Sequence, residues 1–287
     1  MARKKSLFDL YNMKRNGEKI AWLTAYDYPT ATFAEAAGLD MILVGDSLGM
    51  CVYGYSGTLP VTMEQCLGHC EAVRRGAPET FVVGDMPFLS YQPSDAVAVE
   101  NAGRFLKEAE VDAVKLEGGV RVADRIRAIS EAGIVAVGHI GLTPQSSGLL
   151  GGHKAQGRTA EAARLVVLDA VAVEQAGARL LLVEAVPPEV TAYISQTLAI
   201  PVLSIGAGLP CDGQLLIVSD LIGQFQAFTP KFVKKYADVA EVITRAMSEY
   251  VREVKAAEFP GEEHAYRMLE GEEARFLELM GRPWPGN

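Results

Sequence analysis

The sequence has no long apolar run. No stretch approaches the roughly 18 consecutive apolar residues that a membrane-spanning helix needs. The basic residues 1–5 are followed by residues 6–10, which lack the apolar core of a secretory signal. We therefore expect a protein without a membrane span or a signal peptide.

Cysteine is scarce and shows no paired framework. The four cysteines are Cys51, Cys66, Cys70 and Cys211. Cys66 and Cys70 flank His69 at a spacing that could suit a metal, but they also fit a helical apolar pattern with Val73. Because cysteine is among the most buried residue types, we favour core packing. We expect the reducing cytoplasm as the compartment.

Basic residues are also fewer than acidic residues. Lys and Arg total 27 against 36 Asp and Glu, so the net charge is -9, which argues against a nucleic-acid-binding surface. Hydrophobic residues make up 49% and charged residues 22%, as in an ordinary globular protein with ample core. No linker, low-complexity segment or block of like charge interrupts the chain, which predicts one domain over residues 1–287.

Short apolar runs alternate with helical patterns along the chain. Strands are predicted at residues 20–24, 41–46, 80–84, 113–116, 134–138, 179–183, 200–205 and 214–218. Helices are predicted at residues 6–16, 30–37, 62–75, 94–109, 120–132, 159–175, 188–197, 233–253 and 262–280. This α/β alternation predicts a single (β/α)8 TIM barrel with extra terminal helices. The long loops 48–60 and 141–158 interrupt the pattern, and loops of that length are usually functional.

Polar residues follow the predicted strands. They are Asp46, Ser47, Asp85, Lys115, Glu117, His139, Glu184 and Ser204. The C-terminal ends of barrel strands meet at one mouth, so we expect these side chains to be neighbours. Acidic residues after strands are also common helix caps, but no predicted helix directly follows Asp46 or Glu117.

Lys115 lies inside an apolar run and shares a strand face with Glu117. Two inward charges need partners, which favours a functional cluster over helix caps. Carboxylates without a cysteine ligand suit a hard cation such as Mg²⁺. We predict Asp46 and Asp85 as direct ligands, with Glu117 reaching the metal directly or through a water.

Glu184 ends a strongly apolar strand and is separate in sequence from the other carboxylates. Such a desolvated carboxylate suits a general base, and the alternative is a cap for the helix near Pro188. His139 could hydrogen-bond a substrate or be a satisfied core histidine, and both alternatives stay open. We expect His153 and Lys154, in the second long loop, to be surface residues.

Six segments resemble the ketopantoate hydroxymethyltransferase (3-methyl-2-oxobutanoate hydroxymethyltransferase) family. They are LTAYDYPTA (23–31), VGDSLGM (44–50), TLPVT (58–62), KLEGG (115–119), GHIGLTPQS (138–146) and SIGAG (204–208). The matches occur in the same order as in the family and extend over most of the chain. Together they are specific for the family, although each segment alone would not be. The chain departs from the family pattern at residues 51–54, at Gly84 and at residues 152–157, none of which is a proposed ligand.

The resemblance implies transfer of a one-carbon unit from 5,10-methylenetetrahydrofolate to 3-methyl-2-oxobutanoate, giving 2-dehydropantoate in the first step of pantothenate biosynthesis. The matched motifs imply Mg²⁺ ligands at Asp46, Asp85 and Glu117, oxo-acid contacts at Asp46, Ser47, Asp85 and Lys115, and the proton acceptor at Glu184. The family assembles into multimers, often decamers, so a homo-oligomer is implied.

As a hypothesis, Mg²⁺ polarises the 2-oxo acid, Glu184 removes its C3 proton, and the enolate attacks the one-carbon unit. Lys115 would balance the substrate carboxylate, and Ser47 would donate a hydrogen bond. One rival is the phosphoenolpyruvate mutase and isocitrate lyase group, but its Lys-Lys/Arg-Cys-Gly motif does not occur in the sequence. The other is a non-catalytic oligomeric binding protein, which would not need this combination of charges.

Overall fold

The computed structural model describes residues 3–281, so residues 1 and 2 of the basic start lie outside the described residues. Packing divides the chain into two compact units, one up to Ala237 and one from Asp238 onward. All eight strands of the sheet belong to the first unit. The barrel is thus complete before residue 238, and one domain over residues 1–287 stays a prediction.

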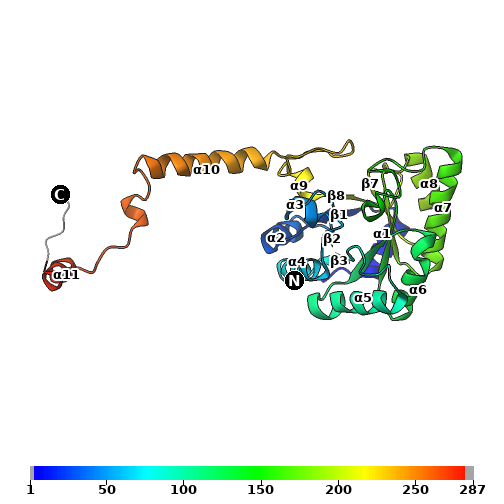
Figure 1. The fold of residues 1–287 in the computed structure, drawn as a ribbon, viewed down its shortest axis with the longest axis horizontal. Coiled ribbons are helices and arrows are strands. Elements are labelled where there is room, and N and C mark those ends of the chain that lie inside the picture. The colour runs from blue at the N-terminus through cyan, green and yellow to red at the C-terminus, as the bar shows by residue number, and fades with distance from the viewer. Residues whose placement is uncertain (1–2, 282–287) are drawn as a thin grey trace. The chain divides into compact units, whose positions relative to one another are not determined.

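The eight strands form a closed parallel barrel in sequence order, with β8 pairing with β1 (Figure 1). They are β1 (Ile20–Thr24), β2 (Met41–Val44), β3 (Phe81–Asp85), β4 (Ala113–Glu117), β5 (Ala136–Gly141), β6 (Leu180–Glu184), β7 (Val202–Ile205) and β8 (Gly213–Leu216). The predicted fold class is confirmed. The main difference concerns β5, which starts two residues later than predicted and continues through His139 to Gly141.

Helices surround this barrel. They are α1 (Leu7–Asn16), α2 (Tyr28–Ala36), α3 (Leu48–Cys51), α4 (Met63–Gly76), α5 (Asp95–Ala109), α6 (Ala123–Glu131), α7 (Ala160–Gln175), α8 (Pro188–Thr197) and α9 (Val218–Leu221). Ser6 and Thr62 cap α1 and α4 as predicted, and each forms a capping box. The helix predicted at residue 30 begins two residues earlier, because Asp27 caps α2 by accepting the Thr30 N–H.

Short helical turns lie inside the two long loops. The first loop opens with α3, and the second contains the 3-10 turn η2 (Pro144–Ser146). A further 3-10 turn, η1 (Val120–Val122), precedes α6, so the predicted helix 120–132 is a turn followed by a shorter helix. The turn η2 folds back onto the mouth of the barrel, because the Gln145 N–H reaches Glu117 at the end of β4.

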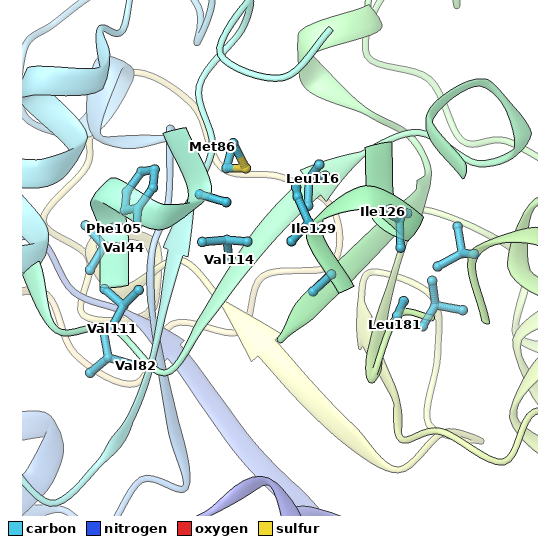
Figure 2. Close-up of a cluster of buried hydrophobic side chains, with 14 of the residues drawn as sticks. Val44, Val82, Met86, Phe105, Val111, Val114, Leu116, Ile126, Ile129 and Leu181 are labelled. Carbon is cyan, nitrogen blue, oxygen red and sulfur yellow. The ribbon is translucent and has the colours of Figure 1, made fainter. Parts of the chain in front are cut away.

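Alternation along the strands separates two apolar cores. Outward residues pack against the helices, and Figure 2 shows Val44 beside Phe105 of α5 and Leu116 beside Ile129 of α6. Cys66 and Cys70 belong to this outer core, so the preference for packing over metal binding is confirmed for their position. Burial of this apolar surface on both faces of the sheet is the main source of its stability.

A second core fills the barrel interior. Its residues come from alternate positions of the strands and include Trp22, Met41, Leu43, Val83 and Leu182. Leu10 of α1 belongs to the same cluster, so α1 covers the N-terminal end of the barrel. With that end closed, the C-terminal end is the open one.

The second unit contains α10 (Val239–Lys255), the 3-10 turn η3 (Glu262–His264) and α11 (Glu272–Met280). The helix predicted at residue 233 begins six residues later, because the chain before it stays tied to the barrel by a hydrogen bond from Tyr236 N–H to the Leu221 carbonyl at 2.8 Å. The helix predicted over residues 262–280 is also wrong in its first half. Gly271, at φ 82°, takes the left-handed conformation before α11 starts.

No helix within residues 3–281 is both long enough and apolar enough to cross a membrane.

Candidate active site

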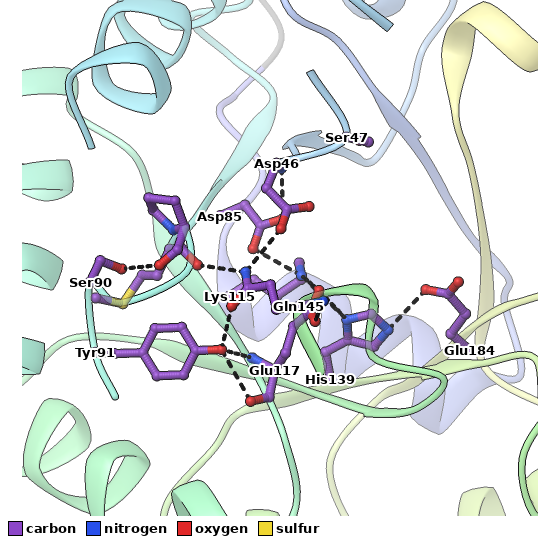
Figure 3. Close-up of polar contacts among 12 residues, drawn as sticks. Asp46, Ser47, Asp85, Ser90, Tyr91, Lys115, Glu117, His139, Gln145 and Glu184 are labelled. Carbon is purple, nitrogen blue, oxygen red and sulfur yellow. Dashed lines mark hydrogen bonds and ion pairs between the residues drawn. The ribbon is translucent and has the colours of Figure 1, made fainter. Parts of the chain in front are cut away.

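The strand register places the predicted residues side by side. Asp85 of β3 pairs with Lys115 of β4, and Glu117 of β4 pairs with His139 of β5. Residues two apart share a face, so Lys115 and Glu117 both project into the barrel with Ala113. The predicted convergence at the mouth is confirmed for these side chains (Figure 3).

Lys115 is a buried ammonium held by carboxylates. Its Nζ lies 2.9 Å from Asp85 Oδ1 and 3.2 Å from Glu117 Oε1. Burial alone would lower the pKa of Lys115, but the neighbouring carboxylates outweigh it and raise the pKa well above its usual range. Burial would likewise raise the pKa of Glu117, but Lys115 and His139 lower it to about 2. Both groups are therefore charged at neutral pH.

Asp46 and Asp85 form a second, less balanced pair. The Asp46 N–H donates to Asp85 Oδ2 at 2.9 Å. Burial, followed by the like charge of Asp85, raises the pKa of Asp46 well above its usual range. Burial also raises the pKa of Asp85, against the opposing charge of Lys115. Asp85 Oδ1 has the ion pair with Lys115 at 2.9 Å, whereas Asp46 has no cation within ion-pair distance among residues 3–281, so the pair is short of positive charge.

Gln145 ties the loop after β5 to these carboxylates. Its Nε2 donates to Asp46 Oδ2 at 2.9 Å and to the Met86 carbonyl at 3.0 Å, and its backbone N–H donates to Glu117 Oε2 at 2.9 Å. The Tyr91 hydroxyl donates to Gln145 Oε1 at 2.8 Å. Sequence reasoning missed both Gln145 and Tyr91, although Gln145 lies inside the family-like segment 138–146.

His139 links Glu184 to the cluster. Its Nδ1 lies 3.3 Å from Glu117 Oε1, and its Nε2 lies 3.1 Å from Glu184 Oε2. Burial and then Lys115 lower the pKa of His139, but the hydrogen bonds to the two glutamates outweigh them and raise it to about 9. Lys115 Nζ also lies 3.3 Å from His139 Nδ1, so the imidazole ring lies between one ammonium and two carboxylates. Both alternatives for His139 stay open, since the ring is buried and lines the pocket, while its Nε2 makes no hydrogen bond of good geometry although it lies 3.1 Å from Glu184.

Ser47 and Ser204 have different surroundings. Ser47 lines the pocket, and its Oγ lies 2.8 Å from the Tyr26 hydroxyl. Ser204 Oγ instead accepts the Ala207 N–H at 3.0 Å, which stabilises the turn after β7. The Ser204 hydroxyl therefore stabilises a local turn, although the sequence predicts Ser204 together with the other polar residues at the strand ends.

Glycine is required beside Glu184. Gly141 has φ 87°, and a Cβ at this position would lie 2.3 Å from the Glu184 carbonyl oxygen. The close approach lets the end of β5 pair with the end of β6, where Glu184 is held.

A pocket of about 940 Å³ opens above these residues. Asp46, Ser47, Lys115, His139 and Glu184 line its floor and wall. Residues of the second long loop and of the segment after β8 line it further out, among them His153, Arg158, Phe225, Phe228, Lys231 and Phe232. His153, predicted as a surface residue, is exposed but also borders this pocket.

The carboxylates at the mouth of the barrel could bind a hard cation such as Mg²⁺ only in part through protein ligands. Within residues 3–281, no group of three or more His, Cys, Asp or Glu side chains is arranged to hold a metal ion. The ammonium of Lys115 lies against Asp85 and Glu117 instead. Asp46 and Asp85, buried and short of positive charge, fit a cation that takes one or two carboxylates and completes its shell with water and substrate oxygens. Binding of Mg²⁺ by Asp46, Asp85 and Glu117 stays a prediction.

Comparisons with known proteins agree on one family. A family model described as "Ketopantoate hydroxymethyltransferase" matches residues 4–262. A 3-methyl-2-oxobutanoate hydroxymethyltransferase from Alkaliphilus metalliredigens (strain QYMF) is 66% identical over 273 residues, covering 95% of this chain and 96% of the relative. A protein of the same name from Geobacillus kaustophilus (strain HTA426) is 50% identical over 268 residues, covering 93% and 96%.

Solved structures with a similar fold are distant in sequence. A phosphonopyruvate hydrolase in complex with oxalate and Mg²⁺ aligns with a TM-score of 0.60 at 13% identity, covering 97% of this chain and 95% of that one. A 2,3-dimethylmalate lyase of the PEP mutase/isocitrate lyase superfamily aligns with a TM-score of 0.58 at 17% identity, covering 98% and 100%. At such identities the likeness supports the barrel fold alone.

Gln145→Leu should destabilise the protein, because it leaves the Asp46 and Met86 oxygens buried without a donor. We expect the free energy of unfolding to fall by about 2 kcal/mol, measured by urea titration. Gln175→Leu is the matched control, since Gln175 is exposed at the end of α7. An equal free energy of unfolding in the two variants would show that the Gln145 amide does not stabilise the fold.

Proposed function

Because the chain belongs to the ketopantoate hydroxymethyltransferase family, we propose that it transfers a one-carbon unit from 5,10-methylenetetrahydrofolate to 3-methyl-2-oxobutanoate in a Mg²⁺-dependent reaction. The products would be 2-dehydropantoate, for pantothenate biosynthesis, and tetrahydrofolate. The observation that carries the proposal is the buried Asp46–Asp85 pair beside an inward ammonium, with Glu184 across the same pocket.

Asp46 and Asp85 are the proposed direct ligands of Mg²⁺. Glu117 already pairs with Lys115 and His139 at 3.2 and 3.3 Å, which favours contact with the metal through a water. When bound, Mg²⁺ would act as a Lewis acid on the substrate carbonyl and neutralise the charge of the two aspartates.

The 2-oxo acid would lie between these aspartates and Ser47. Lys115 supplies positive charge for the substrate carboxylate, while the hydroxyl of Ser47, itself 2.8 Å from the Tyr26 hydroxyl, supplies a hydrogen bond. Asp46 and Asp85 would contact the oxo acid as well as the metal. These contacts hold C3 of the substrate toward Glu184.

Glu184 is the proposed proton acceptor. Its side chain is 15% exposed, and its Oε2 lies 3.1 Å from Nε2 of His139. It would take the proton from C3 to give the enolate. Water would add to the methylene carbon of the folate, whose bonds to N5 and N10 both break, which releases tetrahydrofolate and a one-carbon unit at the oxidation level of formaldehyde. The enolate would attack that carbon, and the resulting alkoxide would take back the proton held by Glu184 to give the hydroxymethyl group. The sequence alternative of a cap on α8 lacks support, because no side-chain hydrogen bond caps that helix.

The size of the pocket supports a second substrate. A five-carbon oxo acid fills only a small part of about 940 Å³. Exposed cations at the outer side, including Arg158 and Lys231, suit the carboxylates of a folate. Assembly into a homo-oligomer, a decamer by family resemblance, and a cytoplasmic location are part of the same proposal.

Asp85→Asn should weaken Mg²⁺ binding, because it removes one of the two carboxylates that face the cation. We expect the Kd measured by isothermal titration calorimetry to rise at least about tenfold, the lower end of the cost of losing a supporting partner in a metal site. Asp124→Asn, on the exposed start of α6, is the control. Unchanged Mg²⁺ affinity in Asp85→Asn would contradict the ligand role.

Glu184→Gln should retain binding of 3-methyl-2-oxobutanoate while kcat for 2-dehydropantoate formation falls by about 10²- to 10⁴-fold, the usual range for a general base. The isosteric amide keeps the shape of the side chain but cannot accept the proton. Glu189→Gln, in the exposed first turn of α8, is the matched control. A kcat equal to that of the parent would exclude Glu184 as the base.

A further inference from the structure

Asp220 is a buried carboxylate that the proposed reaction does not use. It lies in α9, directly after β8, lines the active-site pocket and is 6% exposed. Within residues 3–281, its carboxylate has no hydrogen-bond or ion-pair partner. Its oxygens are not among the fully enclosed polar atoms that lack a partner, so they remain accessible from the pocket, where donors of a bound ligand can reach them.

The other acidic residues of this pocket are already partnered. Lys115 pairs with Asp85 and Glu117, His139 pairs with Glu184, and Gln145 donates to Asp46. Asp220 therefore differs from these residues in having no partner for its carboxylate within residues 3–281. Its pKa is raised by burial, and the distant charge of Lys235 only partly opposes that effect.

The neighbours of Asp220 place it on the Ser47 side of the pocket. After burial itself, the charge of Asp220 contributes to the raised pKa values of Cys51 and Tyr26, so these groups lie within its field. Tyr26 in turn lies 2.8 Å from Ser47. The adjacent hydroxyl of Ser219 is also buried without a hydrogen bond. A ligand bound at Asp220 would thus lie next to the oxo-acid site.

Aromatic side chains follow Asp220 along the chain, and Phe225 is held beside it, because the Phe225 N–H donates to the Ser219 carbonyl at 3.1 Å. Phe225 and Phe228 line the same pocket, with ring centroids 5.4 Å apart and an interplanar angle of 87°. Aromatic side chains that line a pocket offer an apolar surface against which a planar heterocycle can pack. The surroundings therefore combine an anionic acceptor with a surface suited to a flat ring.

We propose that Asp220 is the residue that recognises the pterin ring of the folate co-substrate. The ring amide N–H and the neighbouring exocyclic amino group form a donor–donor edge, which matches the two oxygens of one carboxylate. Charge-assisted bidentate pairs of this kind combine strength with geometric selectivity. The inference rests on the proposed function, because it assigns a contact to the co-substrate of that reaction.

The test is binding of tetrahydrofolate to the full chain saturated with Mg²⁺ and 3-methyl-2-oxobutanoate, measured by anaerobic calorimetry. Asp220→Ala should raise the Kd about 10- to 100-fold, the cost of losing hydrogen bonds to a charged group. Asp220→Asn keeps the shape but presents an amide, so its Kd should rise by a similar factor. Asp124→Asn should bind tetrahydrofolate like the parent.

Two fragments localise the effect. The Asp220 variants should lose affinity for 6-methyltetrahydropterin, which carries the pterin alone, and should keep affinity for p-aminobenzoylglutamate, which lacks it. Equal losses for both fragments would show general collapse of the pocket and overturn the assignment.

The same titrations distinguish failure of the Asp220 assignment from failure of the proposed folate co-substrate. If the parent protein binds tetrahydrofolate and both Asp220 variants bind it within about twofold of the parent, only the assignment of Asp220 is wrong. If the parent itself does not bind tetrahydrofolate, the proposed co-substrate is wrong and the assignment fails with it.

Discussion

The ammonium of Lys115 is the charge on which the arrangement of the site depends. It is buried at the end of a barrel strand, 2.9 Å from Asp85 and 3.2 Å from Glu117. Without it, the carboxylates gathered at the mouth would repel one another in a region of low dielectric. Lys115 nevertheless balances only part of this negative charge. Asp46 and Asp85 still have raised pKa values because of burial and neighbouring charge, and this residual imbalance is what favours a divalent cation.

The barrel supplies the geometry that makes this balance possible. Closure of eight parallel strands brings residues from distant parts of the chain to one mouth, and the register sets Asp85 beside Lys115 and Glu117 beside His139. The apolar interior beneath them excludes water, which strengthens each ion pair. His139 then extends the charged network from Glu117 to Glu184, so the proposed base is oriented by the same cluster that is proposed to hold the substrate. In the proposed reaction, this histidine would couple substrate binding to proton transfer.

Much of this arrangement follows from local patterns in the sequence. The alternation of short apolar runs and helices predicts the barrel, and the i, i+2 spacing of Lys115 and Glu117 predicts a shared inward face. Gln145 could not be found in this way, because its contacts depend on how the loop after β5 folds back, which no period encodes. The unpartnered state of Asp220 is likewise a tertiary property. The late start of α10 depends on a hydrogen bond from Tyr236 to Leu221 rather than on helix propensity.

We propose that this site removes a proton from C3 of 3-methyl-2-oxobutanoate with the aid of Mg²⁺. Exchange of that proton in D₂O can be followed by NMR with Mg²⁺ and then with EDTA, each with and without tetrahydrofolate. We expect exchange that requires Mg²⁺ in at least one of the two folate conditions. Absence of exchange in both, with the substrate shown to be bound, would rule out enolisation of this substrate at the site.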